Sequence, residues 1–278
     1  MSEVDELYVL ARRVLLDALD ALGSHRNAMV LVGAQAVYLR VGEGDLAVAP
    51  FTTDGDLAID PTLLEEIPPL ERALLAANFF PESKDSVGIW ITKRQTSNHS
   101  EAAVAVDLLV PKSMSPGKGT RAARLQGHDA RAARMVQGLE AAMVDAETMK
   151  ITSLERSDNR SFEMRIAGPA ALLVAKVHKI NDRQGTGRGS DKDALDALRL
   201  LRGTETNDLV TRYQKLLNDH RSAEAARVGC ALIETQFAKQ TGIGVEMAIR
   251  SAGVLANANE IAASCVALVE EFLSAIKI

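Results

Sequence analysis

The spacing of hydrophobic residues along this chain changes from a mixture of patterns to a single one. Short apolar runs bounded by glycine, proline or polar turn residues predict strands over residues 28–32, 54–60, 87–93, 103–110, 150–154 and 162–166. Apolar residues at intervals of three and four predict helices over residues 5–22, 35–41 and 63–78. From Pro169 to the C-terminus the periodicity is helical. We therefore expect an α+β protein, with a mixed sheet flanked by helices in residues 1–167 and a helical bundle in residues 168–278.

Composition places the chain among folded proteins. Its 278 residues are 47% hydrophobic, which is enough to bury a sizeable core. No apolar run approaches the roughly 18 residues that cross a bilayer, and the acidic first residues lack the basic end of a signal peptide. We expect a cytoplasmic protein with no membrane partner. Cys230 and Cys265 both lie in apolar helical patterns, which indicates small core residues rather than a disulfide or a zinc site.

Candidate chemistry is concentrated in three aspartates. Asp54 and Asp56 lie two residues apart in a strand-like segment, so their side chains would share one face and could hold a divalent cation. Taken alone, the same pair fits a turn-rich acidic loop equally well. Asp107 interrupts the apolar run 103–110, where an acid is costly to bury unless a metal ion or hydrogen bonds satisfy it. A structural carboxylate is the alternative interpretation of Asp107.

A wider set of motifs resembles the polymerase-beta type of nucleotidyltransferase. The motifs are a strand ending in Gly33-Ala34, the Thr-x-Asp-x-Asp element of residues 52–56, and the distant third acid Asp107. Further along the chain, Lys176-Val177-His178-Lys179 and Lys192-Asp193-Ala194-Leu195-Asp196 resemble the lysine helix and the Lys-Asp-x-x-Asp element of AbiEii and MenT-like toxins. The resemblance covers about residues 28–202. It implies a nucleotidyltransferase core of mixed β-sheet flanked by helices.

The same resemblance implies a set of site residues. Asp54 and Asp56 would be the main ligands of Mg²⁺ or Mn²⁺, with Asp107 as a third ligand or as the base toward an acceptor hydroxyl. Lys176 would bind the triphosphate of an NTP such as ATP, and Lys179 is an alternative because it lies one turn away. The remaining nucleotide contacts would come from Gly33, Ala34, Thr52, Thr53, Asp193 and Asp196.

The function that the resemblance implies is transfer of a nucleotide from an NTP to an acceptor, by the toxin of a toxin-antitoxin system with a cognate antitoxin. A net charge of −5 argues against general nucleic-acid binding. Residues 112–134 are nevertheless basic, either as a solvated helix face or as a patch facing phosphates, which favours tRNA or another RNA as acceptor. The alternatives are a non-catalytic interaction protein that retains the fold and a nucleotidyltransferase acting on a small molecule such as an antibiotic.

Overall fold

The first strand, β1 (Met29–Val32), lies inside the sheet, and all four of its side chains are buried. A strand covered on both faces needs consecutive apolar residues rather than alternating ones, which explains the sequence of this run. β1 ends at Gly33, where α2 (Gly33–Val41) begins. The computed structural model describes residues 3–42, 46, 51–115, 121–186, 191–254 and 256–276.

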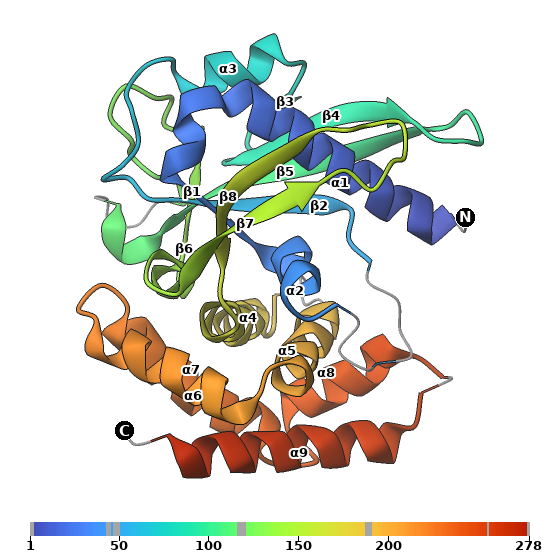
Figure 1. Cartoon of the computed structure of the whole chain (residues 1–278), viewed down its shortest axis with the longest axis vertical. Helices are drawn as coiled ribbons and strands as arrows, with labels where there is room; N and C mark the ends of the chain where they lie inside the picture. Colours follow the sequence, from blue (N-terminus) through green and yellow to red (C-terminus); the bar gives the residue numbers. More distant parts are fainter. Residues whose placement is uncertain are drawn as a thin grey trace. The chain divides into compact units, whose positions relative to one another are not determined.

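Eight strands among these residues form one mixed sheet in the order β3-β4-β5-β2-β1-β8-β7, with β6 paired to β5 (Figure 1). β1 is antiparallel to β2 and parallel to β8, whereas β2 is parallel to β5. The bounds of the other strands are β2 (Asp54–Ile59), β3 (Phe80–Pro81), β4 (Ile89–Gln95), β5 (Glu101–Pro111), β6 (Arg134–Val136), β7 (Ala146–Thr152) and β8 (Ser161–Ala167).

The chain divides into two compact units, neither of which is one continuous stretch. The first comprises Met1–Gln35, Phe51–Val136 and Glu147–Ile166 and contains most of the sheet. Within it, the amphipathic helix α1 (Glu3–Leu22) packs on β2 and β5 and buries Val14, Leu15 and Ala18 (Figure 1). A 3-10 helix, η1 (Gly23–Ala28), connects α1 to β1.

The helix predicted over residues 63–78 is shorter than expected. Only α3 (Leu70–Ala76) forms, and none of residues 61–69 is helical. Pro69 is the N-cap of α3, and Pro68 precedes it. Proline lacks the backbone donor that a helix interior needs and disfavours helical geometry in the residue before it, so the helix starts only after the pair.

The second unit comprises Ala36–Pro50, Gln137–Ala146 and Ala167–Ile278 and is almost entirely helical. α4 is its central element, because it contacts α5, α6, α7 and the 3-10 helix η3 (Leu139–Met143). The helices are α4 (Pro169–Arg183), α5 (Asp191–Gly203), α6 (Thr206–Asn218), α7 (Ala223–Phe237), α8 (Ile243–Ala252) and α9 (Ala258–Ala275). Pro169 occupies the first turn of α4, where its missing N–H costs nothing.

The α+β class is therefore confirmed, with a mixed sheet, flanking helices and a helical C-terminal part. Cys230 and Cys265 are free and buried, as predicted. The division at residue 168 stays a prediction; in the structure, residues 36–50 and 137–146 also belong to the helical unit. Across the described ranges, no helix combines the length and apolar character needed to cross a membrane.

Candidate active site

An acidic face forms where β2 and β5 run side by side. Asp54 and Asp56 alternate with Gly55 and Leu57 in β2, so the two carboxylates project from the same face of the strand. β5 pairs with β2 in parallel, and the register places Asp56 directly opposite Asp107. Paired residues on neighbouring strands point to the same side of a sheet. The structure thus brings Asp54, Asp56 and Asp107 onto one face of two adjacent strands.

Asp54 is held at both its side chain and its backbone. The hydroxyl of the buried Thr52 donates a hydrogen bond to Asp54 Oδ1, whereas Thr53 is exposed. Gln35 Nε2 in α2 donates to the carbonyl oxygen of Asp54 at 2.9 Å. Gln35 Oε1 in turn accepts from Arg12 Nε at 2.7 Å, and Arg12 in α1 is 2% exposed. This chain of hydrogen bonds fixes the position of Asp54 at the start of β2.

Gly33 makes room for Asp56. A Cβ atom at position 33 would lie 2.0 Å from Asp56 Oδ2, and the φ angle of Gly33 is +71°, which residues with a side chain rarely adopt. The Asp56 carboxylate therefore lies against the first residue of α2, where helix N–H groups favour negative charge. Ala34, the next residue, is buried. Glycine at position 33 is thus a steric requirement of the acidic face.

Asp107 is paired with Arg134, at the start of β6. Arg134 Nη2 donates to Asp107 Oδ2 at 2.6 Å, and both side chains are 12% exposed. Burial and the negative charge of Asp56 raise the pKa of Asp107 to about 7, against the opposing effect of Arg134, and Asp54 adds a smaller increase. Arg134 Nη1 is buried without a hydrogen-bond partner among the described residues. Arg134 thus places a positive charge next to Asp107, an acid whose pKa is near neutrality.

Arg134 is a site residue that the sequence did not single out, because it stood among the basic residues of 112–134. The signal for it was weak: a charged residue between the apolar pairs Ala132-Ala133 and Met135-Val136. The helix face considered for this stretch is wrong for residues 121–134, because none of them is helical and Arg134 begins β6. Lys118 lies outside the described residues, and the exposed basic side chains within them are those of Lys112, Arg121, Arg124 and Arg131.

The acidic face offers oxygen donors of the kind that Mg²⁺ prefers. This ion is commonly held by one or two protein carboxylates and completed by phosphate oxygens and water. Within the described ranges, no group of three or more His, Cys, Asp or Glu side chains is arranged to hold a metal ion. Asp107 is engaged by Arg134, which leaves Asp54 and Asp56 as the carboxylates best suited to a cation. The role of all three acids as metal ligands stays a prediction.

The lysine and aspartates of the second motif form a buried charge cluster in the helical unit. Lys176 Nζ in α4 lies 2.8 Å from Asp193 Oδ1 and 2.7 Å from Asp196 Oδ2 in α5, and these side chains are at most 4% exposed. Arg199 adds a contact of 3.1 Å to Asp196 Oδ1. Burial lowers the pKa of Lys176, but the charges of Asp193 and Asp196 outweigh it and leave that pKa above its ordinary value. The sequence motif thus joins α4 to α5.

Two further cations of α4 contact the same cluster from a more open position. Lys179 Nζ is 3.2 Å from Asp193 Oδ1, and Arg183 Nη1 is 3.7 Å from Asp193 Oδ2. Both side chains are 33% exposed, compared with 4% for Lys176. An anion in solvent can therefore reach Lys179 and Arg183 without disrupting the buried contacts of Lys176. Which lysine meets a triphosphate stays a prediction.

Comparison with known proteins adds one structural similarity. No model of a protein family matches the sequence, and no curated protein matches it. Among solved structures, the chain is similar to an antigenic nucleotidyltransferase-like protein from Paracoccidioides brasiliensis. The identity is 18%, the alignment covers 81% of this chain and 93% of that one, and the TM-score is 0.43. A similarity of this extent assigns neither a family nor an activity to the chain.

Proposed function

We propose that the protein is an Mg²⁺-dependent nucleotidyltransferase, which transfers a nucleoside monophosphate from an NTP to an acceptor. The observation that carries the proposal is the acidic face of β2 and β5, on which Asp56 lies opposite Asp107 and Asp54 shares the side of Asp56. Closely spaced carboxylates repel one another. Arg134 offsets this repulsion at Asp107, and a divalent cation would offset it at Asp54 and Asp56.

Asp54 and Asp56 would hold the metal ion. When bound, Mg²⁺ (or Mn²⁺) neutralises negative charge on the triphosphate and orients the phosphorus that is attacked. Thr52 supports this assignment because its hydroxyl orients the Asp54 carboxylate, and Gly33 supports it because its missing side chain leaves room for Asp56. The two carboxylates are sufficient in number, since Mg²⁺ takes its other ligands from phosphates and water.

Asp107 is our candidate for the general base. Its carboxylate is fixed by Arg134 and lies on the strand next to the proposed ligands, so it can accept the proton of an acceptor hydroxyl placed on this face. A base is most effective when its pKa is close to the working pH, and the pKa of about 7 that burial and Asp56 give to Asp107 meets that condition. Arg134 would keep the base oriented and supply positive charge to the phosphates.

Backbone and hydroxyl groups near the acidic face would contribute phosphate contacts. The N–H groups of Gly33 and Ala34 begin α2, and helix N-termini favour phosphate. Thr53 is exposed and directly precedes Asp54, so its hydroxyl lies beside the acidic segment. These three residues are therefore our candidates for nucleotide contacts in the first unit.

Cationic contacts to the triphosphate would come from α4. Lys179 is favoured over Lys176 because its side chain is 33% exposed, compared with 4% for that of Lys176. Asp193 and Asp196 would act indirectly, by holding Lys176 and with it the packing of α4 on α5.

RNA, and tRNA in particular, is our proposed acceptor. The exposed side chains of Lys112, Arg121, Arg124 and Arg131 supply local positive charge on a chain that is acidic overall. RNA phosphates require such cationic partners. A role as the toxin of a toxin-antitoxin system, with a cognate antitoxin and a cytoplasmic location, follows from the resemblance of the sequence motifs and belongs to the same proposal.

A labelled-triphosphate assay tests the proposal. Each of the four NTPs, labelled at the α-phosphate, is incubated with the protein and Mg²⁺ in the presence of total RNA or of small acceptors. We expect label on RNA, and loss of transfer in Asp54→Ala without loss of the folded state. Asp85→Ala, which changes an exposed aspartate, is the matched control and should retain activity.

The other outcomes separate the alternatives. Label on a small acceptor alone would favour the small-molecule nucleotidyltransferase. Failure to bind any NTP in the presence of Mg²⁺, by a folded protein, would favour the non-catalytic interaction protein and reject our proposal.

A further inference from the structure

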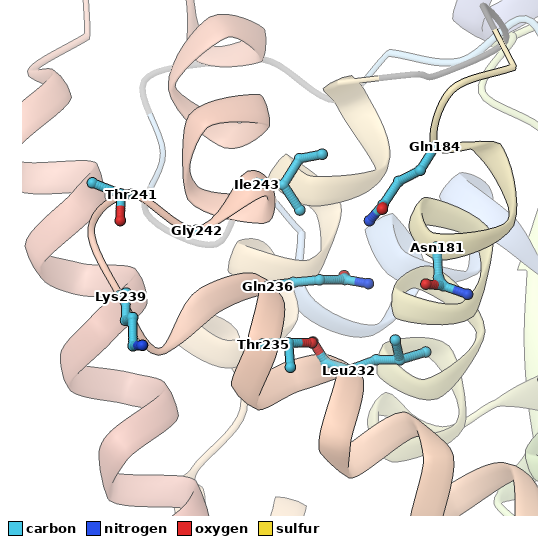
Figure 2. A pocket seen from close by; sticks show the side chains of 9 residues that line it. All are labelled: Asn181, Gln184, Leu232, Thr235, Gln236, Lys239, Thr241, Gly242 and Ile243. Carbon is cyan, nitrogen blue, oxygen red and sulfur yellow. The ribbon is translucent and has the colours of Figure 1, made fainter.

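A cavity of about 380 Å³ opens among the helices of the second unit (Figure 2). Its walls come from the end of α4, the second half of α7, the loop between α7 and α8, and the start of α8. None of the residues proposed above for catalysis is among those that line it. Pockets for small ligands usually have volumes of about 300 Å³ or more, so the volume of this cavity suits a small molecule.

Gln236, which lines this cavity, carries an unsatisfied hydrogen-bond acceptor. The residue is 2% exposed, and its Oε1 atom is buried without a hydrogen-bond partner in the described structure. Its Nε2 atom donates to the carbonyl oxygen of Val177 at 3.0 Å. That bond fixes the orientation of the amide, because a flipped amide would place Oε1 against the carbonyl oxygen of Val177, and both atoms are acceptors. A ligand that satisfies Gln236 must therefore bring a hydrogen-bond donor.

The surroundings of Gln236 suit a flat heterocycle. In Figure 2, the amide end of Gln236 points toward the side of the cavity where Asn181 and Gln184 lie. Leu232 and Ile243 add apolar lining. Asparagine and glutamine amides pair with the donor and acceptor edges of nucleobases, and an apolar wall accommodates the ring face.

The lining also favours a negative charge. Lys239 is its only charged side chain, as far as the described residues show, and the cavity includes Ile243, the first residue of α8. The N-cap of α8 is Gly242, which has no side chain to cap the helix. The first N–H groups of a helix lack partners within it, and a phosphate is a suitable acceptor for them.

We propose that this cavity binds a mononucleotide whose base carries an exocyclic amino group. The amino group would donate to Gln236 Oε1, and the phosphate would meet Lys239 and the start of α8. This inference does not rest on nucleotidyl transfer, because every residue of the cavity belongs to the helical unit and none is a proposed metal ligand.

Calorimetric titration of the full chain in EDTA tests the inference with three ligands. They are AMP, adenosine, and purine riboside 5′-monophosphate, which lacks the amino group. We expect AMP to bind with a Kd of about 1 mM or tighter. The analogue without the amino group should bind at least about tenfold more weakly, because it leaves the buried Gln236 acceptor unpaired.

Two variants locate the binding. Gln236→Met should weaken AMP binding at least about tenfold and abolish the preference for AMP over the analogue. Lys239→Gln should weaken AMP but leave adenosine unchanged. Gln240→Met, which alters an exposed neighbour outside the lining, is the control. A melting curve checks that each variant is folded.

Three results would overturn the inference: no AMP binding up to about 10 mM, equal affinity for AMP and the analogue, or unchanged AMP affinity in a folded Gln236→Met variant. The comparison of ligands on the unmodified chain decides the question even if that variant does not fold.

Discussion

Because Gly33 has no side chain beyond a hydrogen atom, the Asp56 carboxylate can lie against the first turn of α2. Both requirements at this position, the positive φ angle and the absence of a Cβ atom, come from the structure and not from the motif. From the sequence, Gly33 was recognisable as the end of a strand and, through the resemblance, as a candidate nucleotide contact. The position of Asp56 relative to it depends on the antiparallel register of β1 and β2, which pairs Val32 with Asp56.

Replacing Gly33 with alanine should therefore displace Asp56. We expect the free energy of unfolding to fall by about 1–3 kcal/mol and nucleotidyl transfer to fall by about 100-fold, because a displaced ligand disturbs the site geometry. Gly23→Ala is the matched control: its φ is +52°, but nothing lies within 4 Å of the added Cβ. Urea denaturation and the transfer assay measure the two effects. Equal behaviour of the two variants would contradict the steric role of Gly33.

Asp107 should make the stability of the metal-free protein depend on pH. Its pKa is about 7 in the folded state and about 3.9 in an unfolded chain, so the folded state binds more protons between these values. The free energy of unfolding therefore falls as the pH rises from about 4 to about 7, and this contribution is constant outside that window.

Asp107→Asn should remove this dependence, because asparagine does not titrate. Urea denaturation in EDTA should show the variant gaining up to about 2 kcal/mol relative to the unmodified protein between about pH 5 and about pH 7. A difference that stays constant over this interval would mean that Asp107 is already ionised at its lower end.

At the scale of helices and strands, the sequence was sufficient to predict those elements whose signal lies within their own residues. The buried run of β1, the alternation of β2 and the proline that begins α4 each carry their own signal. The pairing of Asp107 with Arg134 has no such local signal. It depends on the parallel register of β5 and β6, which brings together residues that are far apart along the chain. The Lys-Asp-x-x-Asp pattern was recognisable, but whether its acids face solvent or Lys176 depends on the packing of α4 on α5.

The α4–α5 cluster should be far more sensitive at Lys176 than at Lys179. Lys176→Met would leave Asp193 and Asp196 buried without their main cation, which should cost about 3–5 kcal/mol. Lys179→Met removes a partly exposed ion pair and should cost at most about 1 kcal/mol. Urea denaturation compares the two. If the costs were similar, the cluster would not be stabilised mainly through Lys176.

At the scale of the whole molecule, composition and periodicity were enough to predict the α+β class and the helical C-terminal part. They could not show that residues 137–146 join the helical unit, because such a short segment has no periodicity of its own. In the structure, η3 from this segment contacts α4 and α7 and buries Leu139, Ala142 and Met143.

Because the chain enters the helical unit three times, neither unit can be obtained by cutting the polypeptide once. A fragment ending at residue 167 would carry η3 without α4 and α7 and would leave its apolar side chains uncovered. We expect fragments 1–167 and 168–278 to aggregate when each is produced alone and to remain in solution when produced together, as size-exclusion chromatography would show. The two units are therefore interleaved along the sequence, and the chain is not two domains joined end to end.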